Sequence, residues 1–386
     1  MPAATADDDA RPVADLTETE LISRFAPLLP VGSATVVPTG DDAAVIAAPD
    51  RRYVVSTDVL VEGLHFRHGW GDARDVGARA AAQNLADIAA MGAVPRSMVV
   101  GLVLPPDTTV SWVLDLARGL ADVCAPLGVG VDGGDLSAGD QLVVAVTVHG
   151  DLEGRDPVLR SGARPGDVLA HAGVLGRAAA GLAVLSAANV AAARHSAVSE
   201  SDSTDAVRGS TGAAASEPDP TGVVRDATGA GESEPPTEAD FPEGPASAVI
   251  DAFLRPSPPY AAGPSAALAG ATAMMDVSDG LLRDADRLAR ASGVVLSLDP
   301  VAQTSGADLE LVTPLAARLG QDPVSWLLTG GEDHGMLATF PPEVPLPDGF
   351  RRIGAVLAPD GGPGVITHDA LAPGSPGWDH FRRGHP

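Results

Sequence analysis

Five short polar stretches of the chain place carboxylates next to apolar runs. They are TGDDAAVI with Asp41 and Asp42, VVSTDVL with Ser56, Thr57 and Asp58, NLADIAAMGA with Asp87, VDGGDLSAGD with Asp132 and Asp135, and MDVSDG with Asp276 and Asp279. Carboxylate and hydroxyl oxygens ligate hard cations such as Mg²⁺, which proteins usually share with substrate phosphates. Neighbouring carboxylates repel one another unless positive charge lies with them. The set therefore predicts a pocket in which several Mg²⁺ ions carry a polyphosphate.

Each stretch taken alone has a simpler explanation. Asp-Gly and Gly-Asp pairs are common in turns, because Asp caps helices and Gly tolerates positive φ. Asp279 in particular can cap the helix predicted over GLLRDADRLA. Asp87 is the exception, because it lies inside a helical pattern where a cap cannot explain it. Asp87 therefore favours the interpretation that the five stretches form one metal-binding pocket, rather than a series of unrelated turns.

The composition narrows the chemistry further. The 386 residues include no lysine, so a Walker-type loop or a kinase strand lysine is excluded, and arginine, backbone amides or metal ions must balance any phosphate. The net charge of -26 argues against nucleic-acid binding. The nine histidines are scattered in a way that does not suit zinc. The single cysteine, Cys124, lies in an apolar pattern and is interpreted as a small buried hydrophobe rather than a nucleophile.

The pattern along the chain predicts an α+β protein with two domains. Residues 1–15 are acidic and are expected to be disordered, 16–150 form an N-terminal domain of strands and two long helices, and 151–386 form a C-terminal α/β domain. A helix is predicted from Asp72 to Gly92, and the strands AAVIAA and RRYVVST are expected to be neighbours. Residues 196–245 are rich in Ser, Gly, Pro and acids and are interpreted as a disordered insertion. No secretory signal or membrane span is recognised, so a cytoplasmic protein is expected.

The ordered motifs of the chain resemble a known family. The series GDDAAVI, STDVLVEGLHF, NLADIAAMGA, GGDLSAGD, LRSGARPGD, DVSDGLLRD, LLTGGEDHGML and GWDHF is similar to that of thiamine-monophosphate kinases, in the superfamily of aminoimidazole ribonucleotide synthetase and selenophosphate synthetase. The resemblance implies ATP-dependent phosphorylation of thiamine monophosphate with Mg²⁺. It also implies a homodimer in which the N-terminal sheets of two subunits pair into a barrel.

The resemblance assigns roles to individual residues. It implies catalytic roles for Asp58, Asp87 and Asp135, ATP contacts for Gly134, Asp135, Arg160 and Ser278, and an acceptor pocket lined by His65, Glu332 and Trp378. It implies magnesium ligands at Asp41, Asp42, Ser56, Thr57, Asp58, Asp87, Asp135, Asp276 and Asp279.

Several of these roles have open alternatives. Trp378 can be a structural anchor, His65 a structural histidine and Arg160 a surface charge, and the sequence does not choose between Glu332 and its neighbour Asp333. His334 stands where the family often has Tyr. The alternative functions are another ATP-dependent enzyme of the superfamily, or a noncatalytic nucleotide-binding regulator.

Overall fold

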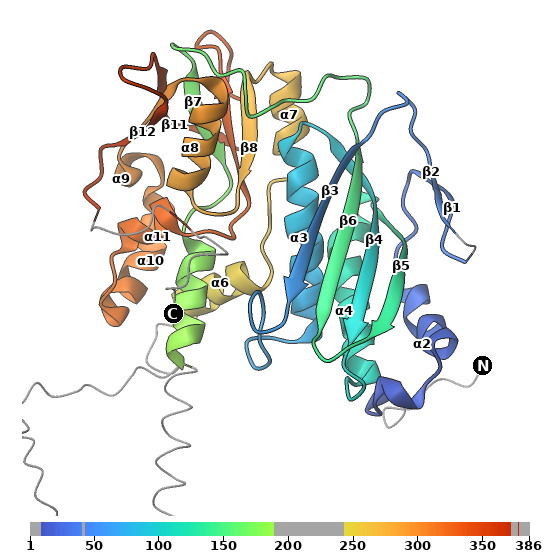
Figure 1. The fold of residues 1–386 in the computed structure, drawn as a ribbon. Coiled ribbons are helices and arrows are strands. Elements are labelled where there is room, and N and C mark those ends of the chain that lie inside the picture. Colours follow the sequence, from blue (N-terminus) through green and yellow to red (C-terminus); the bar gives the residue numbers. More distant parts are fainter. Residues whose placement is uncertain (1–8, 41–42, 189–242, 372–376, 378–386) are drawn as a thin grey trace, which may run out of the picture.

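The computed structural model describes residues 9–40, 43–188, 243–371 and 377 (Figure 1). Three predicted site residues, Asp41, Asp42 and Trp378, lie outside the described residues, as does most of the predicted insertion. The last residues assigned to that insertion, 243–245, belong to a helix. Residues 13–15, expected to be disordered, form a short 3-10 helix.

The N-terminal half is built on a four-stranded sheet in the order β3-β6-β4-β5. β3 pairs antiparallel with β6 and β6 with β4, whereas β4 and β5 are parallel. Two helices, α3 and α4, pack on one face of the sheet and form one hydrophobic core with it. The bounds are β3 Val54–Val61, α3 Ala73–Ala90, β4 Val94–Leu104, α4 Val110–Cys124, β5 Gly130–Ala138 and β6 Val143–Asp151.

Short elements precede and flank this sheet. They are η1 Val13–Asp15, α2 Glu18–Phe25, η2 Ala26–Leu28, β1 Thr35–Val37, β2 Val45–Ile46 and η3 Ala125–Leu127. The predicted pairing of the strands near residues 45 and 55 is wrong, because β2 pairs with β1 to form a separate two-stranded sheet.

The C-terminal half contains a six-stranded sheet in the order β12-β9-β11-β7-β10-β8. Its strands are β7 Val168–Ala172, β8 Ala273–Val277, β9 Val295–Leu298, β10 Gly335–Phe340, β11 Phe350–Leu357 and β12 Gly364–Thr367. A helix over 177–188 and the helices α6 Glu243–Leu254, α7 Ala262–Leu268, α8 Leu281–Ser292, α9 Val301–Thr304, α10 Gly306–Leu319 and α11 Pro323–Thr329 surround it. This sheet has its own large core.

Helix α3 stands between the two sheets and joins the two halves (Figure 1). Small side chains on its outer face, Ala86 and Ala89, form a buried cluster with Ala172 of β7 and Met336 of β10. The approach is so close that a Cβ on Gly263 of α7 would lie 1.8 Å from the carbonyl oxygen of Ala89. The alanine-rich sequence of α3 is therefore explained by contact on both sides of the helix.

The predicted bounds of α3 are confirmed by its capping. Asp72 is the N-cap and forms a capping box with Asp75, and Gly92 follows the last turn with φ +76. Among the described residues, no helix is long and apolar enough to cross a membrane.

Two stretches interpreted as turns prove to be strands. Asp58 lies within β3, and Gly134 and Asp135 lie within β5. Gly-rich sequence normally indicates a turn, but here it is held extended by parallel pairing with β4.

Candidate active site

The predicted residues of β3 and α3 come together beneath the four-stranded sheet. Ser56 and Asp58 alternate onto the face of β3 that α3 covers, and Ser56 Oγ donates a hydrogen bond of 2.7 Å to Asp87 Oδ2. Asn84 Oδ1 accepts from the Asp58 amide at 3.1 Å, and Gln83 Nε2 donates to Asp58 Oδ2 at 3.2 Å. One turn of α3 thus orders the polar residues of β3.

A carboxylate from the other half of the molecule approaches the same place. Burial raises the pKa of Asp87 to about 7, and the nearby Asp276 and Asp58 carboxylates act in the same direction. The hydrogen bond from Ser56 and the charge of His334 oppose that rise. Asp276 is the last residue but one of β8 and is 5% exposed, and Asp87 is partly buried, so like charges lie near each other at the junction where the two halves meet. Such an arrangement favours a cation between them.

The turn after β8 is held by a carboxylate that the sequence analysis missed. Asp284 Oδ2 accepts from the amides of Ser278 at 3.0 Å and Asp279 at 2.9 Å. Burial raises the pKa of Asp284 to about 6, with a further contribution from Asp276. An acid on the same helical face as the buried Leu281 and Leu288 was the available signal.

Asp279 does not cap the following helix. Gly280, with φ +113, is the N-cap of α8 and makes no side-chain cap. The Asp279 carboxylate instead pairs with Arg287 at 2.7 Å. The capping explanation for this residue is therefore wrong, and the Asp279 carboxylate remains beside the junction.

The turn 330–334 lies directly on the turn after β8. The Glu332 amide donates to Ser278 O at 2.8 Å, and Glu332 and His334 have φ values of +72 and +53. Non-glycine residues in this region of backbone space are strained and often mark functional sites. The two turns therefore form one unit at the edge of the six-stranded sheet.

His334 lies between carboxylates. Its ring nitrogens are 3.6 Å from Asp276 Oδ2 and 3.7 Å from Glu332 Oε2. Burial lowers the pKa of His334, but contact with Asp276 and Glu332 outweighs it and raises the pKa to about 10. The imidazolium therefore supplies positive charge inside the acidic site.

Glu332 and Asp333 point to different surroundings. The Asp333 carboxylate accepts from the amides of Gly176 and Ala178 at the start of the helix over 177–188. Burial opposes ionisation of Glu332, but Arg79 and His334 hold its pKa below the usual range. Asp333 thus has a structural role at a helix N-terminus, whereas Glu332 faces the junction.

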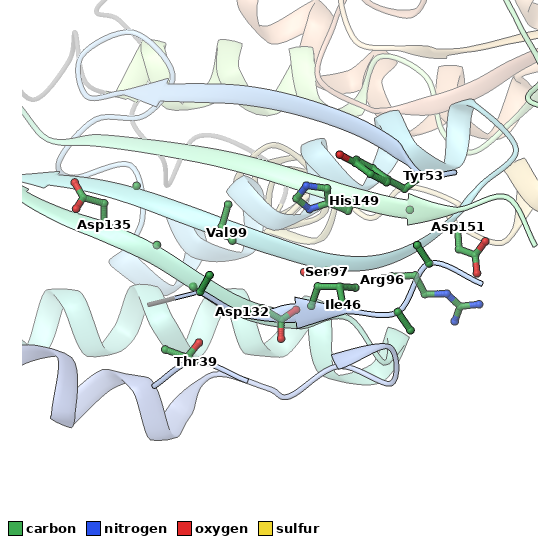
Figure 2. A pocket seen from close by; sticks show the side chains of 18 of the residues that line it. Thr39, Ile46, Tyr53, Arg96, Ser97, Val99, Asp132, Asp135, His149 and Asp151 are labelled. Carbon is green, nitrogen blue, oxygen red and sulfur yellow. The ribbon is translucent and has the colours of Figure 1, made fainter. Parts of the chain in front are cut away.

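Gly134 and Asp135 lie elsewhere, along a cavity of about 860 Å³ on the far face of the four-stranded sheet (Figure 2). Asp135 lies at one end of this cavity and Arg96 at the other, and Asp135 Oδ2 accepts from Ser137 Oγ at 3.1 Å. β5 and β3 are opposite edges of the sheet, with β6 and β4 between them. One protomer therefore does not bring Asp135 to Asp58.

Three further predicted residues lie apart from the junction carboxylates. Thr57 is on the opposite face of β3 from Ser56, and its hydroxyl donates to Val146 O at 2.8 Å. His65 accepts from the Val61 amide at 3.0 Å through Nδ1. Arg160 lies in an exposed loop, where its carbonyl accepts from Ser292 Oγ at 2.9 Å.

The side-chain oxygens at the junction are of the type that ligates a hard cation. Ser56, Asp58, Asp87 and Asp276 offer hydroxyl and carboxylate oxygens, the atoms that Mg²⁺ prefers. Within the described residues, no group of three or more His, Cys, Asp or Glu side chains is arranged to hold a metal ion. The predicted ligands Asp41 and Asp42 lie outside these residues.

Comparison with known proteins shows the family of this chain. The family model for the N-terminal domain of AIR synthase related proteins matches residues 40–152. A thiamine-monophosphate kinase of Mycobacterium tuberculosis is 40% identical over 342 residues, which cover 89% of this chain and 85% of the relative. The chain belongs to the thiamine-monophosphate kinase family.

Solved structures of this family have the same fold. The crystal structure of thiamine monophosphate kinase from Aquifex aeolicus is 26% identical with a TM-score of 0.61, covering 91% of this chain and 95% of that one. AaThiL complexed with AMPPCP and TMP is 25% identical with a TM-score of 0.62, covering 99% and 100%. The similarity covers both halves of the chain.

Proposed function

We propose that the chain transfers the γ-phosphoryl group of ATP to thiamine monophosphate and releases thiamine diphosphate. Its membership of the thiamine-monophosphate kinase family supports the activity. The likeness to AaThiL complexed with AMPPCP and TMP supports the pair of substrates. The observation that carries the proposal is the meeting of Asp87 with Asp58 and Asp276, because these acids come from both halves of the fold.

The junction acids are proposed as the magnesium site. Ser56, Asp58, Asp87, Asp276 and Asp279 would hold Mg²⁺, with Asp41, Asp42, Thr57 and Asp135 as further predicted ligands. Bound Mg²⁺ would supply positive charge against the phosphates of both substrates. The buried carboxylates meet this requirement, since their mutual repulsion is relieved only by a cation or a proton.

The protein's own groups orient the reactants and need not remove a proton. The acceptor oxygen belongs to a phosphate that is already ionised near neutral pH, so phosphoryl transfer depends on positioning and charge neutralisation. Ser278 and Arg160 are proposed ATP contacts, with Gly134 and Asp135. Glu332 is the proposed acceptor contact, with His65 and Trp378, because Asp333 is already engaged at a helix N-terminus.

The open face of the four-stranded sheet is proposed to pair with a second copy. In the protomer this face exposes apolar side chains to water, including Tyr53 at 61%, Val55 at 54% and Val59 at 46%. Pairing with a second copy would bury them. Two such sheets can close into a barrel, and each edge strand then lies beside an edge strand of the other copy. Such a homodimer offers a route by which β5 of a second copy approaches β3.

The proposed domain boundary follows the sheets. Residues 16–150 would bind ATP and Mg²⁺ and form the dimer, and residues 151–386 would complete the acceptor site. Each half contains its own sheet and core, which supports this division.

The decisive experiment combines purified protein with ATP, Mg²⁺ and thiamine monophosphate. Chromatography should detect thiamine diphosphate and ADP in equal amounts, and neither should form when thiamine monophosphate is left out. Nucleotide binding without turnover would instead favour the noncatalytic regulator. ADP formation that ignores thiamine monophosphate would favour another ATP-dependent enzyme of the superfamily.

A further inference from the structure

We propose that Arg79 is a positioning residue that orients the Glu332 carboxylate toward the acceptor substrate. The inference rests on the proposed function, and it adds a residue that the motifs did not single out. Arg79 lies on α3, eight residues before Asp87, which is about 12 Å along a helix axis. It therefore connects the acceptor side of the site to the helix that carries the central acid.

Arg79 is held by three contacts from two parts of the chain, one with Glu332 and two with Phe253. Its side chain is 5% exposed, and Nη2 donates to Glu332 Oε2 at 2.7 Å. Nη1 donates to the carbonyl oxygen of Phe253 at 2.9 Å, and the guanidinium carbon lies 4.2 Å from the centre of the Phe253 ring. The ring of Trp70 packs edge-on against Phe253 at 5.8 Å, so the platform under the guanidinium is itself fixed.

The burial of the two partners is unequal. The Glu332 side chain keeps 33% of its surface exposed, whereas that of Arg79 is almost fully enclosed. A buried guanidinium without its carboxylate would be strongly unfavourable, so Arg79 draws Glu332 into one orientation. Since Arg79 and His334 both approach Oε2, the partly exposed carboxylate can accept a further hydrogen bond from a ligand.

The backbone around Glu332 supports the same interpretation. Glu332 adopts a φ of +72, and its amide is bound to Ser278 O at 2.8 Å. A strained turn would have little reason to persist for a surface carboxylate, and strain of this kind is usual where a side chain must be aimed. Arg79 fixes the end of the side chain, and the turn fixes its base.

A guanidinium is required for this geometry. Its planar fork reaches the Phe253 carbonyl and the Glu332 carboxylate at once, while its face lies on the Phe253 ring. A lysine ammonium is a compact charge that cannot make all three contacts. Arg79→Lys therefore keeps the charge and removes the orientation.

The test compares Arg79→Lys and Arg79→Gln with Arg74→Gln. Arg74 is on the same helix and pairs with Asp122 at the surface, so its replacement controls for loss of an arginine from α3. Binding of thiamine monophosphate is measured by calorimetry, and KM for each substrate by ADP release. We expect roughly 10- to 100-fold weaker acceptor binding in both Arg79 variants, because a buried charged hydrogen bond is lost. The KM for ATP should stay within about threefold of wild type, and Arg74→Gln should match wild type.

A double variant distinguishes positioning from a general structural effect. If Arg79 acts through Glu332, the acceptor affinity of Arg79→Gln with Glu332→Gln should be no weaker than that of the poorer single variant. The proposal would be overturned if the losses of acceptor affinity in the two single variants multiplied in the double variant. Equal increases in KM for both substrates would also overturn it. Unchanged acceptor binding in folded Arg79→Lys would also overturn it. If wild type binds thiamine monophosphate without converting it, the proposed function is wrong. The difference in thiamine monophosphate affinity between wild type and the Arg79 variants still tests the role of Arg79.

Discussion

The two sheets of the molecule differ in how their faces are covered. In the six-stranded sheet, every residue of β8 and β10 is buried, because helices α7 and α3 lie on one face and α8 and its neighbours on the other. In the four-stranded sheet, most residues of β3 alternate between half-buried and exposed positions, and those of β6 between buried and half-buried positions. Strands β8 and β10 are therefore covered on both faces within the protomer, whereas the four-stranded sheet presents a free face.

The difference indicates which part of the site is fixed within one protomer and which part requires contact with a second protomer. The six-stranded sheet brings Asp276, Glu332 and His334 together where β8 ends and β10 begins. The half-covered sheet places Asp135 in mid-strand, on the side of the cavity. Preorganised charge is most effective in a water-excluded site. The junction can therefore be tested in the protomer, whereas the role of β5 requires the assembly.

The largest expected effect is the loss of activity in Asp87→Asn. Asparagine keeps the shape and the hydrogen bond from Ser56, but it removes the charge that would hold Mg²⁺. We expect kcat to fall by at least about 10³-fold, the scale seen when one strong electrostatic contact to a transition state is lost. Steady-state ADP release measures this, with the exposed helix residue Asp115→Asn as control. Activity within tenfold of wild type would contradict a central role for Asp87.

The same variant makes a prediction about pH in metal-free protein. Burial and the Asp276 charge raise the pKa of Asp87 to about 7. Between the ordinary carboxyl pKa and 7, the folded state binds more protons than the unfolded state, so stability falls as pH rises. Asp87→Asn lacks that slope. Its Tm relative to wild type, measured with chelator, should therefore increase from pH 4 to pH 8, and a constant difference would show that Asp87 is not confined among like charges.

The next prediction concerns the proposed pairing of two copies through the free face of the four-stranded sheet. Val55→Asp places a charge among the exposed apolar residues of β3, and burying it in a barrel would be strongly unfavourable. The dimer should dissociate, and analytical ultracentrifugation should report half the wild-type mass. Ile366→Asp, at a position 46% exposed on β12, is the matched control and should leave the mass unchanged. A monomeric wild type would show that the face is covered in some other way.

What the sequence predicted well depended on local signals. The bounds of α3 follow from Asp72 and Gly92, and the burial of Cys124 follows from the apolar pattern of α4. The predicted position of Asp87 inside a helix is confirmed, and its carboxylate accepts a hydrogen bond from Ser56, whereas its catalytic role stays a prediction. In each case the deciding chemistry lies within a few residues along the chain.

What the sequence did not predict depended on distant contacts. Gly134 and Asp135 are extended only because β5 pairs with β4, so their glycines gave a misleading turn signal. Arg79 gains its role from Phe253 and Glu332, which are 174 and 253 residues away along the chain. No local pattern distinguishes such an arginine from one on a helix surface.

A smaller effect is expected at the packing of α7 against α3. In Gly263→Ala, the new methyl group would lie 1.8 Å from the Ala89 carbonyl oxygen, so the two helices must separate. Overpacking of this kind costs about 1–3 kcal/mol. Denaturant unfolding measures the loss, and kcat should fall with it because α3 carries Asp87. Gly244→Ala, in an open position of α6, is the control and should be neutral or slightly stabilising. Equal stability of both variants would show that the junction can adjust.

The smallest effect on activity is expected at Cys124, which ends α4 in the core of the N-terminal half. Its side chain is fully buried, with Sγ 3.8 Å from Met98 Sδ, and burial raises the pKa of the thiol to about 12. Only a thiolate reacts with a thiol reagent, so native protein at pH 8 should not be labelled, while unfolded protein should take up one equivalent. Cys124→Ala should leave kcat unchanged and lower stability slightly. Rapid labelling of native protein would mean that α4 separates from the four-stranded sheet, so that the face it covers is less stably packed than the structure shows.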